Sequence, residues 1–286
     1  MNRQEFRFFE HLRVRWSEVD LQKIVFNAHY LMYFDTAITG YWRALAMPYA
    51  DAMEILGGDL FVRKASVEFH ASARWDDRLD IGMRCSRIGN SSITITGAIF
   101  RGDQLLITSE LIYVFADPST QTSRPVPDPM RQWLEAFEAG ESMLHVQTGD
   151  WEALKDSASA VRTQVFVQEQ GISQEDEWDA ADSTAVHTVI RNRLGQPVGT
   201  GRLLQDAPGI ARIGRMAVLH PLRSAGVGKA IMTALEHAAH VRGDTEVVLN
   251  AQRSAEDFYR RLGYVARGEP YDEVGIPHIT MARKLS

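Results

Sequence analysis

The residues best suited to chemistry lie in the glycine-bearing turn 223–229, which joins a short apolar strand predicted at 213–219 to an amphipathic helix. Gly226 and Gly228 allow the backbone to approach a ligand closely, and the first helical N–H groups have no partner within the helix. Together with the helix dipole, these N–H groups form a site for an anion, most often a phosphate. The turn is therefore predicted to bind a phosphorylated cofactor.

The spacing of this turn excludes two common phosphate-binding motifs. A Walker A loop requires glycine at position 223 and Ser or Thr at position 230, where the chain has Arg223 and Ala230. A dinucleotide-binding fingerprint that starts at Gly226 requires a further glycine where the chain has Ile231. The arrangement that fits is Arg-x-x-Gly-x-Gly over 223–228. A purely structural strand-turn-helix stays open as the alternative.

Length and composition are those of a globular chain with two domains of ordinary size. The 286 residues are 45% hydrophobic and 24% charged, and the net charge of −6 gives neither half the basic surface that binds nucleic acid. No apolar run reaches membrane-spanning length and the N-terminus has no signal-peptide core, so we expect a cytoplasmic protein without a membrane partner. The single cysteine, Cys85, excludes an intrachain disulfide and a cysteine-based metal site, and we expect no bound metal.

A domain boundary is predicted near residue 140, because four prolines within 117–130 break regular structure. We therefore expect domains at 1–140 and 141–286. In the first domain, a helix predicted at 30–45 is apolar around most of its circumference, as buried helices are.

Strand patterns accompany this helix in the first domain. They lie at 8–16, 60–69, 79–85, 93–100 and 105–115. Turn signals between the last three predict an antiparallel meander. The combination predicts an α+β domain in which an antiparallel sheet curls around a central helix.

The segment 14–33, VRWSEVDLQKIVFNAHYLMY, resembles the signature of hot-dog thioesterases of the 4-hydroxybenzoyl-CoA thioesterase type. That signature is a strand that ends in Asp, a loop of the form x-x-Gly-x-Val, a turn that bears Asn or His, and a Tyr that opens the central helix. The resemblance covers about residues 5–138 and implies a hot-dog domain that takes an acyl-CoA substrate. It implies that Asp20 is the catalytic carboxylate, acting on the thioester as nucleophile or general base, and that Asn27 and His29 line the site.

One position departs from this signature. Lys23 stands where the family usually has the loop glycine, and a backbone that required glycine would be strained there. The alternative role for Asp20 is an ordinary loop carboxylate or a helix cap. Hot-dog sheets expose an edge and build their sites between subunits, so the resemblance also implies a homodimer or a higher homo-oligomer.

The second half alternates strands and helices. A helix is predicted to start at 161–170 and to lead into the acidic segment 171–182, a solvated loop that could also attract a cationic amine. A second helix, with a capping-box start, is predicted at 254–262. Strands are predicted at 187–192, 197–204, 213–219, 246–251 and 276–284. This order predicts a mixed sheet with helices on both faces.

Three separate segments of this half, RIGRMAVLHPLRSAGVGKA, LNAQRSAEDFYRRLGY and GIPHITMARKL, are similar to the GNAT acyltransferase superfamily. The VFVxEQ and GIPH segments resemble its bacterial ElaA-like subgroup. The similarity spans about residues 146–286 and implies a GNAT α/β domain that binds acetyl-CoA. It also implies that Tyr259 protonates the leaving thiolate. The residues implied in cofactor binding, through a strand edge and the pyrophosphate turn, are Met216, Ala217, Val218, Arg223, Ser224, Ala225, Gly226, Val227, Gly228 and Lys229.

Acyl transfer to an amine also needs a base that removes a proton from the amine. The candidates are Glu169, His187 and His278, and for each the alternative role is a structural hydrogen bond. Because two unrelated patterns imply CoA on one chain, we expect a two-domain CoA-dependent enzyme that hydrolyses an acyl-CoA and transfers an acetyl or acyl group to an amine. The alternative is an acyl-CoA-binding sensor or assembly module in which one or both domains do not turn over.

Overall fold

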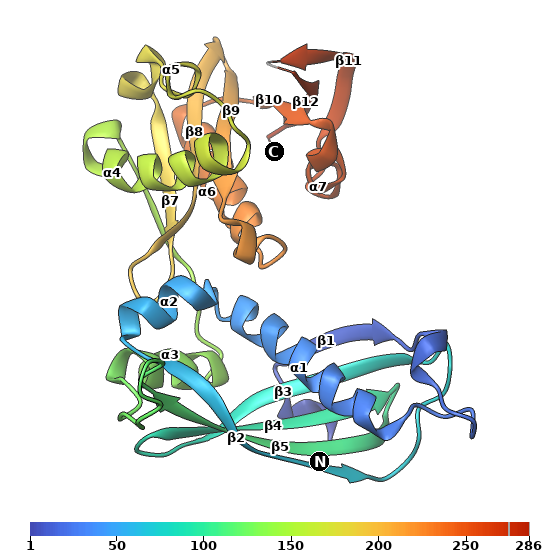
Figure 1. Ribbon diagram of the computed structural model, residues 1–286. Helices are drawn as coiled ribbons and strands as arrows, with labels where there is room; N and C mark the ends of the chain where they lie inside the picture. Colours follow the sequence, from blue (N-terminus) through green and yellow to red (C-terminus); the bar gives the residue numbers. More distant parts are fainter. Residues whose placement is uncertain (274, 286) are drawn as a thin grey trace. The chain divides into compact units, whose positions relative to one another are not determined.

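The computed structural model describes residues 1–273 and 275–285 and divides into two compact units, Met1–Met143 and Leu144–Ser286 (Figure 1). Each unit has its own sheet, with five strands in the first and seven in the second. No helix in the described part of the chain is long and apolar enough to cross a membrane.

The sheet of the first unit is antiparallel throughout and has the strand order β1-β3-β4-β5-β2. Its strands are β1 (Phe8–Arg13), β2 (Asp59–Phe69), β3 (Arg78–Ile88), β4 (Ser92–Arg101) and β5 (Gln104–Ala116). Its helices are α1 (Asn27–Ala44), α2 (Tyr49–Leu56) and α3 (Asp128–Glu138). The pairing of β3, β4 and β5 confirms the predicted meander, and the sequence patterns did not predict α2.

Helix α1 lies along one face of this sheet (Figure 1). A Cβ atom on Gly97 of β4 would come within 2.5 Å of the Phe34 ring, so only glycine lets the helix pack this closely. Near the C-terminal end of α1, the Tyr41 hydroxyl donates to the Glu138 carboxylate of α3 at 2.5 Å. The Cys85 backbone N–H donates to the same carboxylate oxygen at 2.9 Å. These contacts fix α1 on the sheet and therefore fix the position of its N-terminus.

The sheet of the second unit is mixed and has the strand order β11-β12-β10-β9-β8-β7-β6, in which only β9 and β10 are parallel. Its strands are β6 (His145–Gly149), β7 (Val186–Arg191), β8 (Pro197–Ala207), β9 (Ile210–Val218), β10 (Glu246–Gln252), β11 (Val265–Glu273) and β12 (Ile276–Lys284). Its α-helices are α4 (Trp151–Arg162), α5 (Gln174–Glu177), α6 (Val227–Arg242) and α7 (Glu256–Arg261).

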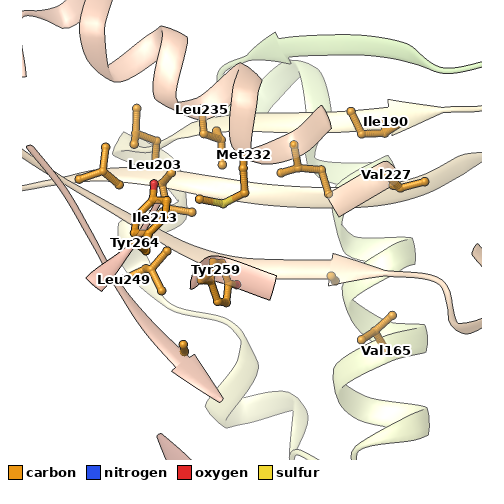
Figure 2. Packing of buried hydrophobic residues seen from close by; sticks show 14 of the residues in the cluster. Val165, Ile190, Leu203, Ile213, Val227, Met232, Leu235, Leu249, Tyr259 and Tyr264 are labelled. Carbon is orange, nitrogen blue, oxygen red and sulfur yellow. The ribbon is translucent and has the colours of Figure 1, made fainter. Parts of the chain in front are cut away.

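Helices cover both faces of this sheet, as predicted. Successive residues of a strand point to opposite faces. On β7, Val189 packs with Leu154 of α4, whereas Ile190 joins the core cluster that contains Leu235 of α6. Figure 2 shows this core, with Met232 and Leu235 close to the strands.

Two details of the predicted helices are wrong. The first helix starts at Trp151, where the Asp150 side chain caps it, and its end continues as the π-helical segment Thr163–Glu169. The second has no capping box, because α7 follows a 3-10 turn and its N-cap, Ala255, has no side chain that can accept a hydrogen bond. π-Helical segments often mark functional sites, and this one brings Phe166 to the cavity described below.

Candidate active sites

Asp20 lies in a tight turn between β1 and α1. Its backbone N–H donates to the Ile24 carbonyl at 2.9 Å, and its carbonyl accepts from the Lys23 N–H at 2.9 Å. The side-chain Oδ1 accepts from the Gln22 N–H at 2.8 Å. The half-buried carboxylate is therefore held through one oxygen, and the described residues offer no hydrogen-bond partner to the other.

Lys23 adopts the left-handed backbone conformation that the resemblance implies for this loop, with φ of 61°. For a residue other than glycine this conformation costs about 1 kcal/mol. The loop therefore keeps its turn at the expense of local strain, which is common where a side chain has to be aimed.

Asn27 and His29 lie in the first turn of α1, next to the Asp20 turn. Asn27 is the first residue of the helix, is exposed, and follows an N-cap, Phe26, that makes no side-chain capping bond. His29 is half-buried, and its Nδ1 atom is buried without a hydrogen-bond partner in the described part of the chain. A buried polar atom without a partner commonly marks a site for water or a ligand.

Glu18 is a buried carboxylate that the sequence analysis missed. It is 3% exposed, and its two oxygens accept from the Arg15 N–H and Nε at 2.7 Å and from the Tyr33 hydroxyl of α1 at 2.8 Å. Its carbonyl accepts from the Phe26 N–H at 2.9 Å. Burial alone would raise the pKa of Glu18, but these hydrogen bonds outweigh burial and hold the pKa below its ordinary value. Glu18 thus ties the chain that carries Asp20 to the central helix.

Exposed apolar side chains surround the Asp20 turn. Trp16 is 76% exposed and its ring lies 6.3 Å from that of Trp75 in an edge-to-face contact. Leu21 is fully exposed and Phe26 about half exposed. The Val25 N–H donates to the Ala73 carbonyl at 2.9 Å, which holds the two loops together. We call Trp16, Leu21, Phe26 and Trp75 the apolar rim; clusters of this kind mark surfaces that bind something apolar.

In the second unit, β9 and β10 pair only at their first residues and then separate. The register runs from Ile210 opposite Glu246 to Ile213 opposite Leu249. Beyond that point a cavity of about 480 Å³ opens between the strands. Met216 lines the cavity, while Ala217 and Val218 pair with β8 on the opposite edge of β9. The backbone of Met216, Ala217 and Val218 has no strand partner on the cavity side among the described residues.

The turn before α6 has the conformation of an anion site. Ser224 has φ of 70° and Gly226 has φ of 84°. Gly226 is the N-cap of α6 and makes no side-chain capping bond, so the amides of Val227 and Gly228 begin the helix without a partner within it. The Ala230 N–H already donates to the Gly226 carbonyl at 3.0 Å. This geometry can receive a phosphate group on main-chain donors.

Arg223 makes a contact that the sequence did not predict. Its guanidinium donates to both carboxylate oxygens of Glu169, at 2.6 and 2.7 Å, and its Nε donates to the Val218 carbonyl at 3.3 Å. The side-chain charge of Arg223 is thus neutralised by Glu169. In this structure Glu169 is engaged by an ion pair and does not line the cavity.

Tyr259 of α7 belongs to the core cluster drawn in Figure 2. It also lines the cavity and is 8% exposed. Its hydroxyl has no hydrogen-bond partner in the ranges that the structure covers. Burial raises the pKa of Tyr259 to about 12. The hydroxyl therefore keeps its proton at neutral pH and can donate it to a group in the cavity.

The two candidate histidines are in different surroundings. His187 is 1% exposed, its Nε2 lies 2.9 Å from the Asp182 carbonyl oxygen, and its ring packs on Trp151 away from the cavity. Burial lowers the pKa of His187. His278 on β12 lines the cavity. The structure therefore brings His278 and Tyr259 to the same cavity and leaves His187 in a structural role.

The prediction of a solvated loop at 171–182 is wrong for Glu177 and Asp182, which are buried, and for the short helix α5. Arg162, which is 1% exposed, donates to the carboxylates of Glu177 at 2.5 Å and Asp182 at 2.9 Å. Arg202 donates to Asp182 at 2.8 Å and to Asp179 at 2.7 Å. Burial opposes ionisation of Asp182, but the hydrogen bonds from both arginines hold its pKa below the ordinary value. Glu177, Asp179 and Asp182 are thus each neutralised by an arginine and are not free to attract an amine.

Within the described residues, no group of three or more His, Cys, Asp and Glu side chains is arranged to hold a metal ion. Cys85 is half-buried, and burial raises the pKa of its thiol to about 12. The thiol is thus protonated at neutral pH and is not a reactive nucleophile.

Comparisons with known proteins match the two units separately. Residues 154–285 match the family model described as acetyltransferase (GNAT) domain, and residues 22–108 match the one described as thioesterase superfamily. The uncharacterized N-acetyltransferase YjcF of Bacillus subtilis is 42% identical over 134 residues, which are 46% of this chain and 93% of that protein. Protein ElaA of Escherichia coli is 35% identical over 129 residues, 44% of this chain and 84% of that protein. The crystal structure of Slr0204, a 1,4-dihydroxy-2-naphthoyl-CoA thioesterase from Synechocystis, is 18% identical with a TM-score of 0.41, over 44% of this chain and 94% of that one.

Proposed function

We propose that the chain, which belongs to the GNAT acetyltransferase family through its second unit and matches the thioesterase superfamily model over residues 22–108 of its hot-dog first unit, is an enzyme with two CoA-ester activities. The first unit hydrolyses an acyl-CoA. The second transfers an acetyl or acyl group from CoA to an amine. The observation that carries the proposal is the cavity between β9 and β10, which connects an unpaired strand edge with the buried hydroxyl of Tyr259.

In the second unit, each part of the geometry suits one part of an acyl-CoA. The main-chain donors at the start of α6 suit the pyrophosphate. The backbone edge of Met216, Ala217 and Val218, which has no strand partner on the cavity side among the described residues, can pair with the pantetheine amides as an added strand would, once the Val218 carbonyl is released by Arg223. Tyr259 donates a proton to the sulfur as the carbon–sulfur bond breaks, so that CoA leaves as the thiol.

In the first unit, Asp20 is the group that acts on the thioester. Its carboxylate attacks the carbonyl carbon, or takes a proton from a water molecule that attacks it, and the products are a carboxylic acid and free CoA. The partnerless Nδ1 of His29 and the amides at the start of α1 can hold the reacting groups. The apolar rim of Trp16, Leu21, Phe26 and Trp75 supports an acyl group that is itself apolar.

We also propose that the first unit associates with a second copy along β2. This strand is eleven residues long, lies at the edge of the sheet, and exposes Val62 and Phe69. A long exposed edge strand is a template for pairing with another chain. Sedimentation of the full chain at a single protomer mass of 32.2 kDa would contradict this proposal.

The alternative, an acyl-CoA-binding module without turnover, is motivated by the departure of Lys23 from the loop glycine of the hot-dog signature. Purified protein mixed with acyl-CoAs of increasing chain length separates the two. An enzyme releases the thiol at many turnovers per protein and forms N-acetylated product when an amine is added. A module binds the acyl-CoA but releases no more than stoichiometric thiol, and that outcome would reject both proposed activities.

Replacement of Tyr259 by Phe is expected to slow acetyl transfer by about 100-fold, the lower end of general-acid effects, with little change in the Kd of acetyl-CoA. The ring that packs the cavity is kept and only the proton donor is lost. The measurement is the rate of N-acetylated product by mass spectrometry, beside the Kd by calorimetry.

The matched control for this variant is Tyr264→Phe. The Tyr264 hydroxyl donates to Glu236 at 2.8 Å, and Tyr264 does not line the cavity. This variant should therefore transfer acetyl groups at the wild-type rate, although the lost hydrogen bond should make the folded protein less stable. If Tyr259→Phe weakened binding and slowed transfer by the same factor, Tyr259 would be a packing residue instead.

A further inference from the structure

The hairpin of β11 and β12 forms one wall of the second unit's cavity and carries His278 toward it. We propose that His278 is the general base that accepts the proton of the acceptor amine. This inference rests on the acetyl transfer proposed above, which leaves the base unassigned. Three observations support it: the tautomer of the ring, its fixed orientation, and the engagement of Glu177 and Asp179 by arginines.

The tautomer of His278 follows from one hydrogen bond. Its Nδ1 lies 2.8 Å from the carbonyl oxygen of Ile276. A carbonyl oxygen can only accept, so Nδ1 carries the hydrogen. In a neutral imidazole the other nitrogen, Nε2, then has the free lone pair and can accept a proton. The main chain thus prepares His278 to act as a base through Nε2.

The orientation of the ring is fixed by its neighbour across the hairpin. Tyr271 on β11 lies opposite His278 in the strand register, and the two rings stack with centroids 6.1 Å apart and an interplanar angle of 24°. A hydrogen bond on one side and a stacked ring on its face leave the imidazole little freedom to rotate. Orientation of this kind is what a general base needs, because proton transfer requires hydrogen-bond reach.

The other carboxylates that line the cavity are less suited to this step. Glu177 is bound by Arg162, and Asp179 is bound by Arg202 and Arg215, so each holds an arginine instead of a free lone pair toward the amine. Glu273 on β11 is exposed, and no hydrogen bond among the described residues fixes the orientation of its carboxylate toward the cavity.

The transfer step balances with these residues. Nε2 of His278 accepts the proton that the amine nitrogen loses as its bond to the carbonyl carbon forms. The carbon–sulfur bond then breaks, and the Tyr259 hydroxyl gives its proton to the sulfur. Solvent returns a proton from His278 to Tyr259 before the next turnover.

The charged and titratable groups around His278 come from every wall of the cavity. They are Glu273 on β11, Arg212 and Arg215 on β9, Arg202 on β8, Tyr259 on α7, and Glu177 and Asp179 from the segment after the π-helix. Tyr271 on β11 does not line the cavity but stacks on the imidazole. The arginines are paired with carboxylates, Arg212 with Asp206 at 2.6 Å and Arg215 with Asp179 at 3.1 Å. A change in the pH profile on replacing His278 alone can therefore be assigned to the imidazole.

The test uses the full chain with Asp20→Asn, which removes competing hydrolysis of acetyl-CoA. Acetyl transfer to n-butylamine, ethanolamine, putrescine, glucosamine and triglycine is measured from pH 5 to 9. His278→Gln is expected to lower kcat/KM by 10²- to 10⁴-fold and to leave the KM for acetyl-CoA unchanged. It should also abolish the acid limb of the pH profile, which is the fall in kcat/KM as the pH decreases and the base becomes protonated. Glu273→Gln, the control on the same hairpin, is expected to keep the acid limb.

A second variant guards against misfolding. His278→Ala should regain activity when imidazole is added, which a purely structural role would not allow. If His278→Gln keeps both the rate and the acid limb, or if the limb disappears in Glu273→Gln instead, this inference is wrong while the proposed acetyl transfer stands. If the Asp20→Asn chain binds acetyl-CoA and acetylates none of the probes, the proposed transfer fails and this inference fails with it.

Discussion

Replacement of Asp20 by Asn is expected to reduce acyl-CoA hydrolysis at least 10³-fold, because an amide neither attacks a thioester nor takes a proton from water. The substitution isolates this chemistry from folding. Asparagine keeps an oxygen that can accept the 2.8 Å hydrogen bond from the Gln22 N–H, and the turn is otherwise closed by backbone bonds to Lys23 and Ile24. The measurement is thiol release under saturating acyl-CoA, beside the Kd of a non-hydrolysable acyl-CoA thioether.

The matched control is Asp103→Asn, which changes an exposed carboxylate in the turn between β4 and β5 of the same unit. This variant should hydrolyse at the wild-type rate. The Kd of the thioether should stay within about twofold in both variants, since the carboxylate acts on the reacting carbonyl. Unchanged hydrolysis in Asp20→Asn would remove Asp20 from the mechanism and leave it the role of a turn-forming residue.

Local patterns predicted the elements that bury one face. The strands β3 and β5 alternate apolar and polar residues, and β3, β4, β5 and α1 all lie near the predicted ranges. The expectation that α1 is buried on most sides was wrong, because it exposes Leu31 and Met32 and packs through one face. Strand β11 was missed because nearly all of its residues are exposed, so its side chains show no period. It is held by backbone pairing with β12, which a pattern of side chains does not record.

The residues of the candidate sites also fall into two groups, those that a local motif indicates and those that depend on contacts between distant parts of the chain. The turn at 223–228 and Tyr259 could be proposed from the sequence because each lies in a short local motif, and both stay predictions as site residues. The pairing of Arg223 with Glu169, 54 residues away, and the burial of Glu18 depend on contacts made only after folding. The acidic segment was misread for this reason, since its charges resemble a solvated loop until Arg162 and Arg202 are brought to them.

Replacement of Arg162 by Met is expected to lower the free energy of unfolding of the second unit by about 3–5 kcal/mol, as the loss of one partner from a buried ion pair does. The guanidinium carbon also lies 4.4 Å from the ring centroid of Trp178. Methionine fills part of the volume but leaves the Glu177 carboxylate, which is 2% exposed, without its main donor. Arg215 lies 3.5 Å from Glu177 and compensates only in part. Because Glu177 and Arg202 line the cavity, acetyl transfer should fall as well.

Hydrogen exchange read by mass spectrometry assigns this loss to one unit, since peptides from 144–285 should exchange faster while those from the first unit keep their protection. Arg261→Met, an exposed position on α7, is the control and should change neither. If the cost arises from an uncompensated charge, adding Glu177→Gln to Arg162→Met should recover part of the lost stability, because a neutral amide is less costly to bury. A double variant less stable than Arg162→Met alone would instead show that Glu177 stabilises the unit through its remaining contacts, and that packing of the arginine accounts for the loss.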